Sequence, residues 1–227
     1  MMKIQKVEHN YNKLKEVLGW SVDKRVTLSL AGYYTSLEKD VDSVRFNKIK
    51  EILKNRVSVF SPLRSHLQPL FTSVLDVSGQ EPEEAIDQLL LKVEELKKKS
   101  FKMNDYTYVA ALMMSDESDK WDFEISRAME LMSAMKVHHR FLTNSDDYPF
   151  AIFLGKLEGD ITTRAATMNK YYEELKNHKF YAGNELQWLS QVLTYTNPGY
   201  DKETVPRVVV IRDGFKSVKI KFSISQY

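Results

Sequence analysis

The sequence has no cysteine, few glycines and prolines, and no long apolar run. The absence of cysteine excludes disulfides, thiolate nucleophiles and every metal site with a cysteine ligand. Eight glycines and six prolines in 227 residues provide few tight turns, which argues against a many-stranded sandwich or barrel. No apolar run approaches the roughly 20 residues that a membrane-spanning helix needs, so we expect no membrane partner. A mostly helical protein is the remaining expectation.

Charge of one sign is also scarce, because 33 Lys and Arg face 31 Asp and Glu, a formal net charge of +2. The balance is +3 over residues 1–100, −4 over residues 101–196 and +3 over residues 197–227. No segment has the sustained positive charge that a phosphate backbone requires, so we expect no nucleic acid partner. Residues 1–19 lack the apolar centre of a signal peptide, which predicts a cytoplasmic protein.

The sequence does contain a repeat of about 40 residues. Four equivalent segments are marked by the dipeptides Leu96-Lys97, Met135-Lys136, Leu175-Lys176 and Phe215-Lys216. An apolar residue follows each dipeptide after five or six positions, at Phe101, Phe141, Phe180 and Ile220. The positions ten and seven residues before each dipeptide are also apolar, and this spacing returns to one face of a helix. A second apolar column lies between these segments, at Leu30, Leu70, Ala110, Phe150 and Leu189.

Each repeat unit is therefore predicted to contain an inner, more buried helix and an outer, more charged helix. The inner helices are expected over residues 22–37, 62–76, 104–115, 145–157 and 183–196. The outer helices are expected over residues 42–55, 81–99, 121–137, 161–177 and 203–217. Stacked hairpins of this kind predict an all-α fold, a right-handed α-solenoid of about five helical hairpins. We expect a single domain over residues 1–227, with residues 1–19 as an N-terminal capping helix.

The last residues, 220–227, have the pattern of another inner helix that begins and does not finish. Because a natural array closes with a polar terminal repeat, this pattern predicts a truncated array. An unfinished unit leaves an apolar end, through which two copies of the chain could associate.

At these residues the chain resembles a known family. The recurring Leu-Lys pair, the Phe that follows it, and the Asp-Asp-Tyr stretch within residues 143–148 are similar to the domain of unknown function 4003 family of Bacillus-like bacteria. The resemblance extends from about Tyr11 to Tyr227 and is best over His139 to Ala151. It implies a bacterial, cytosolic, helical protein, and it implies no activity because the family is uncharacterised.

The sharpest polar cluster combines His138 and His139 with Asp146 and Asp147. Two imidazoles and two carboxylates are suitable ligands for zinc, iron or manganese, and such a metal could activate water for hydrolysis. The alternative is ordinary capping or turn chemistry, because His139 and His178 occupy the same turn of consecutive units. Adjacent histidines on a loop also point in different directions. We favour the second interpretation and predict no metal and no cofactor.

Aromatic residues suggest a binding surface. Tyr108 and Tyr148 occupy equivalent positions of the repeat, and aligned tyrosines could line a concave groove for a peptide or a small ligand. The same rings could instead fill the core between helices. The candidate binding residues are Tyr108, His139, Asp147, Tyr148 and Gln187.

Together these observations favour a cytosolic interaction module that binds a protein, a peptide or a ligand through its inner-helix face. No catalytic signature is visible, so we predict that the protein is not an enzyme. The alternative is a metal-dependent hydrolase with a site at residues 138–147, and a purely structural or self-associating array is a third possibility.

Overall fold

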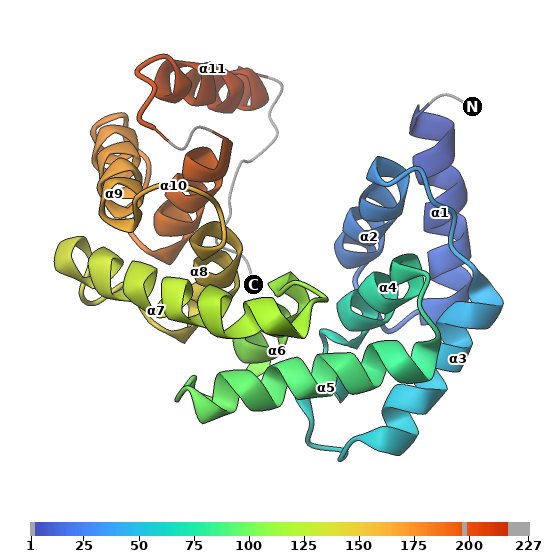
Figure 1. The fold of residues 1–227 in the computed structure, drawn as a ribbon. Coiled ribbons are helices and arrows are strands. Elements are labelled where there is room, and N and C mark those ends of the chain that lie inside the picture. Colours follow the sequence, from blue (N-terminus) through green and yellow to red (C-terminus); the bar gives the residue numbers. More distant parts are fainter. Residues whose placement is uncertain (1–2, 197–198, 218–227) are drawn as a thin grey trace. The chain divides into compact units, whose positions relative to one another are not determined.

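The computed structural model describes residues 3–196 and 199–217, and it is helical throughout (Figure 1). No strand occurs in these two ranges. Eleven α-helices run through them: α1 Lys3–Leu18, α2 Lys24–Ser36, α3 Ser43–Arg56, α4 Gln68–Ser78, α5 Pro82–Lys98, α6 Asp105–Met113, α7 Trp121–His138, α8 Tyr148–Gly155, α9 Ile161–Asn177, α10 Asn184–Thr196 and α11 Thr204–Ser217. Three short 3₁₀ helices precede α4, α7 and α8: η1 Pro62–Arg64, η2 Ser118–Lys120 and η3 Ser145–Asp147. The predicted all-α class is confirmed.

The predicted helices correspond to the observed ones one by one, with two informative differences in their starts. The inner helices expected from residues 62 and 145 begin later, at Gln68 and Tyr148, and each is preceded by a 3₁₀ helix. In both cases a proline in the first turn, Pro69 or Pro149, marks the true start. A first-turn proline loses no hydrogen bond, because its N–H would have no helical partner.

The chain divides into two compact units, residues 1–112 and residues 113–227, called unit 1 and unit 2. In unit 1, the predicted inner-column residues Leu30, Ala31 and Tyr34 of α2 are buried against Leu14 and Leu18 of α1. Helix α1 thus packs on α2, and the role of residues 1–19 as a capping helix stays a prediction. Predictions of handedness, of a continuous solenoid and of a single domain concern the whole chain, and they stay predictions.

In unit 2, the outer helices α7 and α9 pack on each other, and α8 and α10 pack against them (Figure 1). One buried cluster joins Leu131 and Met135 of α7 to Leu154 of α8 and Ala165 and Met168 of α9. A second cluster joins α9 to α10 and α11 through the aromatic and aliphatic residues Tyr171, Tyr172, Leu175, Leu186, Leu193 and Val205. The column residues Met135, Ala165, Met168, Leu175 and Val205 therefore lie in the core of this unit, whereas Phe141 is exposed.

Helix α8 approaches α7 very closely at Gly155. A Cβ atom at this position would lie only 3.0 Å from the backbone nitrogen of Ala128. The carbonyl groups at the end of α8 are capped by two arginines: Arg127 of α7 donates from Nε to the Gly155 carbonyl (3.1 Å), and Arg164 of α9 donates from Nη1 to the Leu154 carbonyl (2.8 Å). The short inner helix is thus fixed on both sides by outer helices.

The outer helices end in two different ways. At the ends of α5 and α9, Phe101 and Phe180 donate backbone N–H bonds to Leu96 and Leu175, five residues earlier. The preceding Ser100 and Lys179 have positive φ angles of 66° and 64°. This Schellman pattern turns the Phe side chain back toward its own helix. Helix α7 ends without it, because His139 is extended (φ −134°) and the next turn joins Leu142 N–H to the His139 carbonyl.

Two predictions concern residues that are not described. The unfinished inner helix at residues 220–227, and self-association through it, lie outside the described residues. Within the described ranges, none of the helices is long and apolar enough to span a bilayer.

Candidate functional site: a buried carboxylate and the exposed stripe of α10 in unit 2

A local turn carries the carboxylate of Asp147 into the interior of unit 2. The side chain of Asn144 accepts a hydrogen bond from the Asp146 N–H (2.9 Å), while Oδ2 of Asp147 accepts one from the Asn144 N–H (3.0 Å). This reciprocal capping box starts η3 and holds the Asp147 side chain against its own turn. Asp147 is only 1% exposed.

Helix α10 supplies the other partners of Asp147. Gln187 and Gln191 are one helical turn apart and lie on the same face of α10. Both donate from Nε2 to Oδ1 of Asp147, at 2.8 and 2.7 Å. The carboxylate thus accepts three N–H bonds, which tie the start of α8 to the middle of α10.

No cation accompanies this carboxylate: within the described ranges Asp147 forms no ion pair. Burial raises the pKa of Asp147, while the hydrogen bonds from Gln187, Asn144 and Gln191 oppose the rise. Buried charges without a counter-ion are costly, and hydrogen bonds to the charged form reduce that cost. The two glutamines therefore have a defined electrostatic role.

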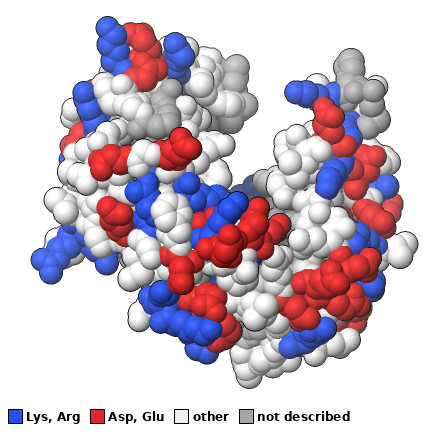
Figure 2. Space-filling model, viewed as in Figure 1, with Lys and Arg blue, Asp and Glu red and all other residues white. Residues whose placement is uncertain are grey.

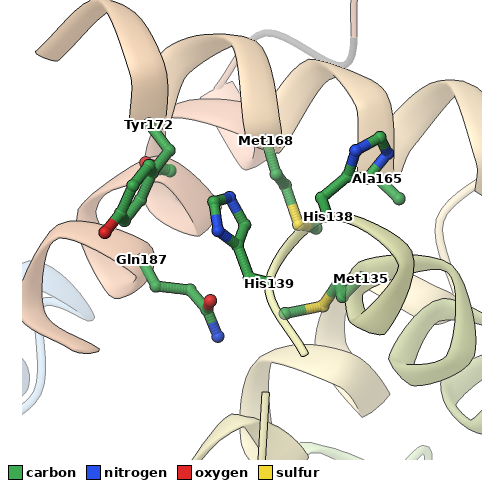
Figure 3. A pocket seen from close by; sticks show the side chains of 8 residues that line it. Met135, His138, His139, Ala165, Met168, Tyr172 and Gln187 are labelled. Atoms are coloured by element: carbon green, nitrogen blue, oxygen red, sulfur yellow. The ribbon is translucent and has the colours of Figure 1, made fainter. Parts of the chain in front are cut away.

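A small cavity of about 10 Å³ lies beside His139, and this volume is close to that of one water molecule. Figure 3 shows the imidazole of His139 between Tyr172 and Met168, with the amide end of Gln187 below it. The rings of His139 and Tyr172 are 4.3 Å apart. Burial lowers the pKa of His139, so the imidazole is neutral at pH 7.

Several buried polar atoms around this carboxylate and cavity have no hydrogen-bond partner among the described residues: His139 Nε2, Thr143 Oγ1, Gln187 Oε1 and Gln191 Oε1. Buried polar atoms are normally satisfied by protein or by ordered water. The cavity beside His139 and Gln187 provides room for one such water.

The opposite face of α10 is apolar and exposed. Val192 and Tyr195 are 42% and 47% exposed, and Trp188 is half-buried one turn before Val192. The Tyr195 ring contacts Phe153 of α8, with a centroid separation of 4.7 Å. The buried face contains the polar residues Gln187, Ser190, Gln191 and Thr194, beside Leu186 and Leu193. Helix α10 therefore buries four polar side chains together with Leu186 and Leu193, and it exposes the apolar side chains of Val192 and Tyr195.

The predicted candidates separate into two groups. Asp147 and Gln187 are directly bonded, and His139 lines the cavity with Gln187. Tyr148 is the half-buried first residue of α8. Tyr108 belongs to α6 in unit 1, where its ring meets the edge of Phe71 at 6.4 Å. Their role in binding stays a prediction.

Sequence reasoning missed Gln191 and Thr143, and it placed Tyr172 only among the aromatic residues that either line a groove or fill the core. A signal for Gln191 was available, because Gln187 and Gln191 are four residues apart on one face of a helix and a shared partner is consistent with that spacing. No comparable signal points to Thr143.

The histidines and aspartates of the alternative metal site do not form a common set of ligands. Figure 3 shows the rings of His138 and His139 pointing in different directions, as expected of neighbours in a turn. Asp147 is occupied by its three N–H donors. Within residues 3–196 and 199–217, no three His, Cys, Asp or Glu side chains gather as a metal-binding group.

Fold and site together define an all-α protein of helical hairpins, with a carboxylate buried between hairpins and clamped by amides. The family model described as protein of unknown function (DUF4003) matches residues 10–227, so the chain belongs to that family and the predicted resemblance is confirmed. It is 26% identical over 188 residues to the uncharacterized protein YeaA of Bacillus subtilis (strain 168). The match covers 81% of this chain and 57% of YeaA, so the chain spans little more than half of that relative. No solved structure matches.

Proposed function

We propose that this protein is an interaction module whose unit 2 binds an apolar helical segment of a partner protein on the exposed face of α10. The observation that carries the proposal is the exposed apolar stripe of α10, formed by Val192 and Tyr195 with the half-buried Trp188. A helix normally turns its apolar stripe to the core, so an outward stripe is available to a partner.

The chemistry of the partner follows from the charge of this surface. Residues 186–200 and 148–155, which contain most of α10 and all of α8, include no Lys, Arg, Asp or Glu. The partner must therefore offer apolar side chains. A helix in a groove, with anchors at i, i+4 and i+7, is a recurrent way of matching such a stripe.

Asp147 acts here as a positioning residue. Its bonds to Gln187 and Gln191 fix the rotation of α10 about its own axis. Ser190 and Thr194 satisfy their hydroxyl groups within the helix, by donating to the Leu186 and Ser190 carbonyls at 2.8 Å. The polar face is thereby stable inside, and the apolar face remains outside.

The test is a selection of ligands for the whole chain from a displayed library of amphipathic helical peptides. We expect the selected peptides to share an apolar stripe, and Val192→Glu or Tyr195→Glu to weaken their binding by about tenfold or more. Phe123→Ser is the matched control, because Phe123 of α7 is 61% exposed and lies outside the α10 stripe. Ligands whose affinity is the same for V192E, Y195E and F123S would refute the proposal.

A further inference from the structure

Two aromatic rings project from unit 2 into solvent. Phe141 follows α7 and Tyr181 follows α9, and both side chains are 96% exposed. They are 40 residues apart, at matching points of consecutive repeat units. Neither ring contributes to the packing of the helices, and the two recur at the same point of consecutive units.

Both rings leave the same end of the unit. His139, directly after α7, stacks on Tyr172, near the end of α9, so the carboxyl ends of these two helices lie together. The inward neighbours of the two rings, Leu142 and Phe180, pack against one buried cluster. Each loop thus packs one side chain inside and exposes an adjacent one: Phe141 before Leu142, and Tyr181 after Phe180.

This end of the unit has more cations than carboxylates. The segments 136–145 and 176–184 contain the cations Lys136, Arg140, Lys176 and Lys179 and no Asp or Glu. Two carboxylates flank them, because Glu173 approaches Lys176 and Glu185 lies beside Gly183. We call residues 136–145 and 176–184 the basic edge. Figure 2 shows Lys and Arg side chains projecting from the molecule at the end of α7, where the edge begins.

These cations are available to a partner. Within the part of the chain that the structure describes, Lys136, Arg140 and Lys179 form no ion pair, whereas Lys176 approaches Glu173 at 3.3 Å on an exposed helix surface. The helix dipole stabilises cations near the carboxyl end of a helix. The dipole does not explain why fully exposed aromatic rings accompany them.

We propose that the basic edge docks on the surface of an anionic lipid bilayer. The four Lys and Arg side chains match the charge of the lipid phosphates, at the number typical of such sites. The rings of Phe141 and Tyr181 enter the interfacial region, where aromatic side chains are favoured. The two rings project into solvent and line no groove. A lipid bilayer can bind such projecting rings because it needs no preformed pocket. This attachment uses neither a membrane-spanning helix nor the exposed face of α10.

The experiment measures partition of the whole chain onto two kinds of vesicle: phosphatidylcholine alone, and phosphatidylcholine with about a third phosphatidylglycerol. We expect binding to the anionic vesicles to be at least about tenfold stronger, and to weaken as salt screens the charges. Arg140→Glu combined with Lys179→Glu is expected to lower the partition coefficient by about twentyfold or more. Phe141→Ser combined with Tyr181→Ser is expected to lower it by about tenfold.

Phe123→Ser is again the control, because it removes an exposed ring of α7 outside the edge and is expected to leave binding unchanged. Thermal unfolding of each variant checks that the fold persists. Equal binding to both kinds of vesicle, or no binding to either, would overturn the proposal. So would retention of binding in the ring variant. Tighter binding to a polyglutamate peptide than to anionic vesicles would also overturn it and would indicate an acidic protein partner.

Discussion

Each unit buries one aspartate carboxylate, and the two solve the same electrostatic problem differently. In unit 1, Asp76 accepts a hydrogen bond from the Tyr34 hydroxyl (2.7 Å) and lies 3.4 Å from Nε of Arg45. In unit 2, Asp147 has two glutamine amides and a backbone N–H in place of a cation. Burial raises the pKa of both carboxyls. The Arg45 cation neutralises the charge of Asp76. The two glutamine amides instead bind Asp147 from one face of α10, and these bonds fix the rotation of that helix.

The two units also differ in the ion pairing of the cations near their exposed aromatic rings. Trp20 and Phe60 of unit 1 are as exposed as Phe141 and Tyr181. Their neighbouring cations are engaged, since Arg25 pairs with Asp23 at 2.6 Å and Arg56 pairs with Asp87. These two cations of unit 1 are paired, whereas Lys136, Arg140 and Lys179 of unit 2 form no ion pair among the described residues.

The largest effect is expected from Arg45→Ala in unit 1. Arg45 compensates Asp76 and also donates from Nε to the Asp76 carbonyl at 3.2 Å, near the end of α4. Its loss leaves a buried carboxylate without a cation, and we expect the free energy of unfolding to fall by about 3–5 kcal/mol. Urea denaturation measures it. Arg56→Ala, which breaks an exposed pair, is the control and should cost about 1 kcal/mol or less.

The next effect compares two glycines in inner helices. Gly155→Ala places a methyl group against the backbone of α7, so we expect a loss of about 2–3 kcal/mol. Gly32→Ala in α2 of unit 1 meets no atom within 4 Å and should stabilise by about 0.5–1 kcal/mol. Thermal melting of both variants checks the opposite signs. Equal effects would show that α8 is not packed as closely as described.

A smaller effect is expected from Gln191→Leu. It removes one of the two amide donors to Asp147 and should cost about 1–2 kcal/mol. If the amides also orient α10, binding of selected peptides should weaken by more than this loss of stability explains. Val192→Thr, which leaves Asp147 and its donors intact, is the control for stability.

The smallest effect is a change in the pH dependence of stability. The folded pKa of Asp147 is raised above its ordinary value of 3.8, so the native state binds the proton more readily than the unfolded state. Stability from this group is therefore present below pH 3.8 and is lost as the pH rises through the folded pKa. We expect Asp147→Asn to lack this loss.

His139 acts in the opposite direction, because its lowered folded pKa makes stability rise with pH below its ordinary value of 6.5. The difference in unfolding free energy between wild type and Asp147→Asn, measured from pH 3 to pH 7, cancels this contribution because His139 is present in both proteins. A difference that is independent of pH would contradict the raised pKa of Asp147.

Apolar columns were sufficient to predict the helices, because a helix that packs on one side must repeat its apolar positions. Outer helix α9 was predicted with its observed bounds, residues 161–177. Starts such as those at Gln68 and Tyr148 depend on proline and on local side-chain caps, which apolar periodicity does not contain.

The site was only partly predictable. Asp147 and Gln187 were chosen as members of an inner face, yet their direct bond joins residues 40 positions apart and depends on how hairpins stack. The Phe column was treated as uniform, although Phe101 is 6% exposed and Phe141 is 96% exposed. The cause is visible in the spacing: Phe101 lies five residues after Leu96, and Phe141 lies six residues after Met135.

The extra residue at the end of α7 determines which of two neighbouring side chains, Phe141 or Leu142, faces the core. With five residues, the Schellman turn closes and the Phe faces its own helix, as in α5 and α9. With six, Leu142 takes the inward place and Phe141 is presented to solvent. A repeat protein of this kind can acquire or retire a surface ring by gaining or losing one loop residue, which exchanges the one side chain that faces inward from that loop.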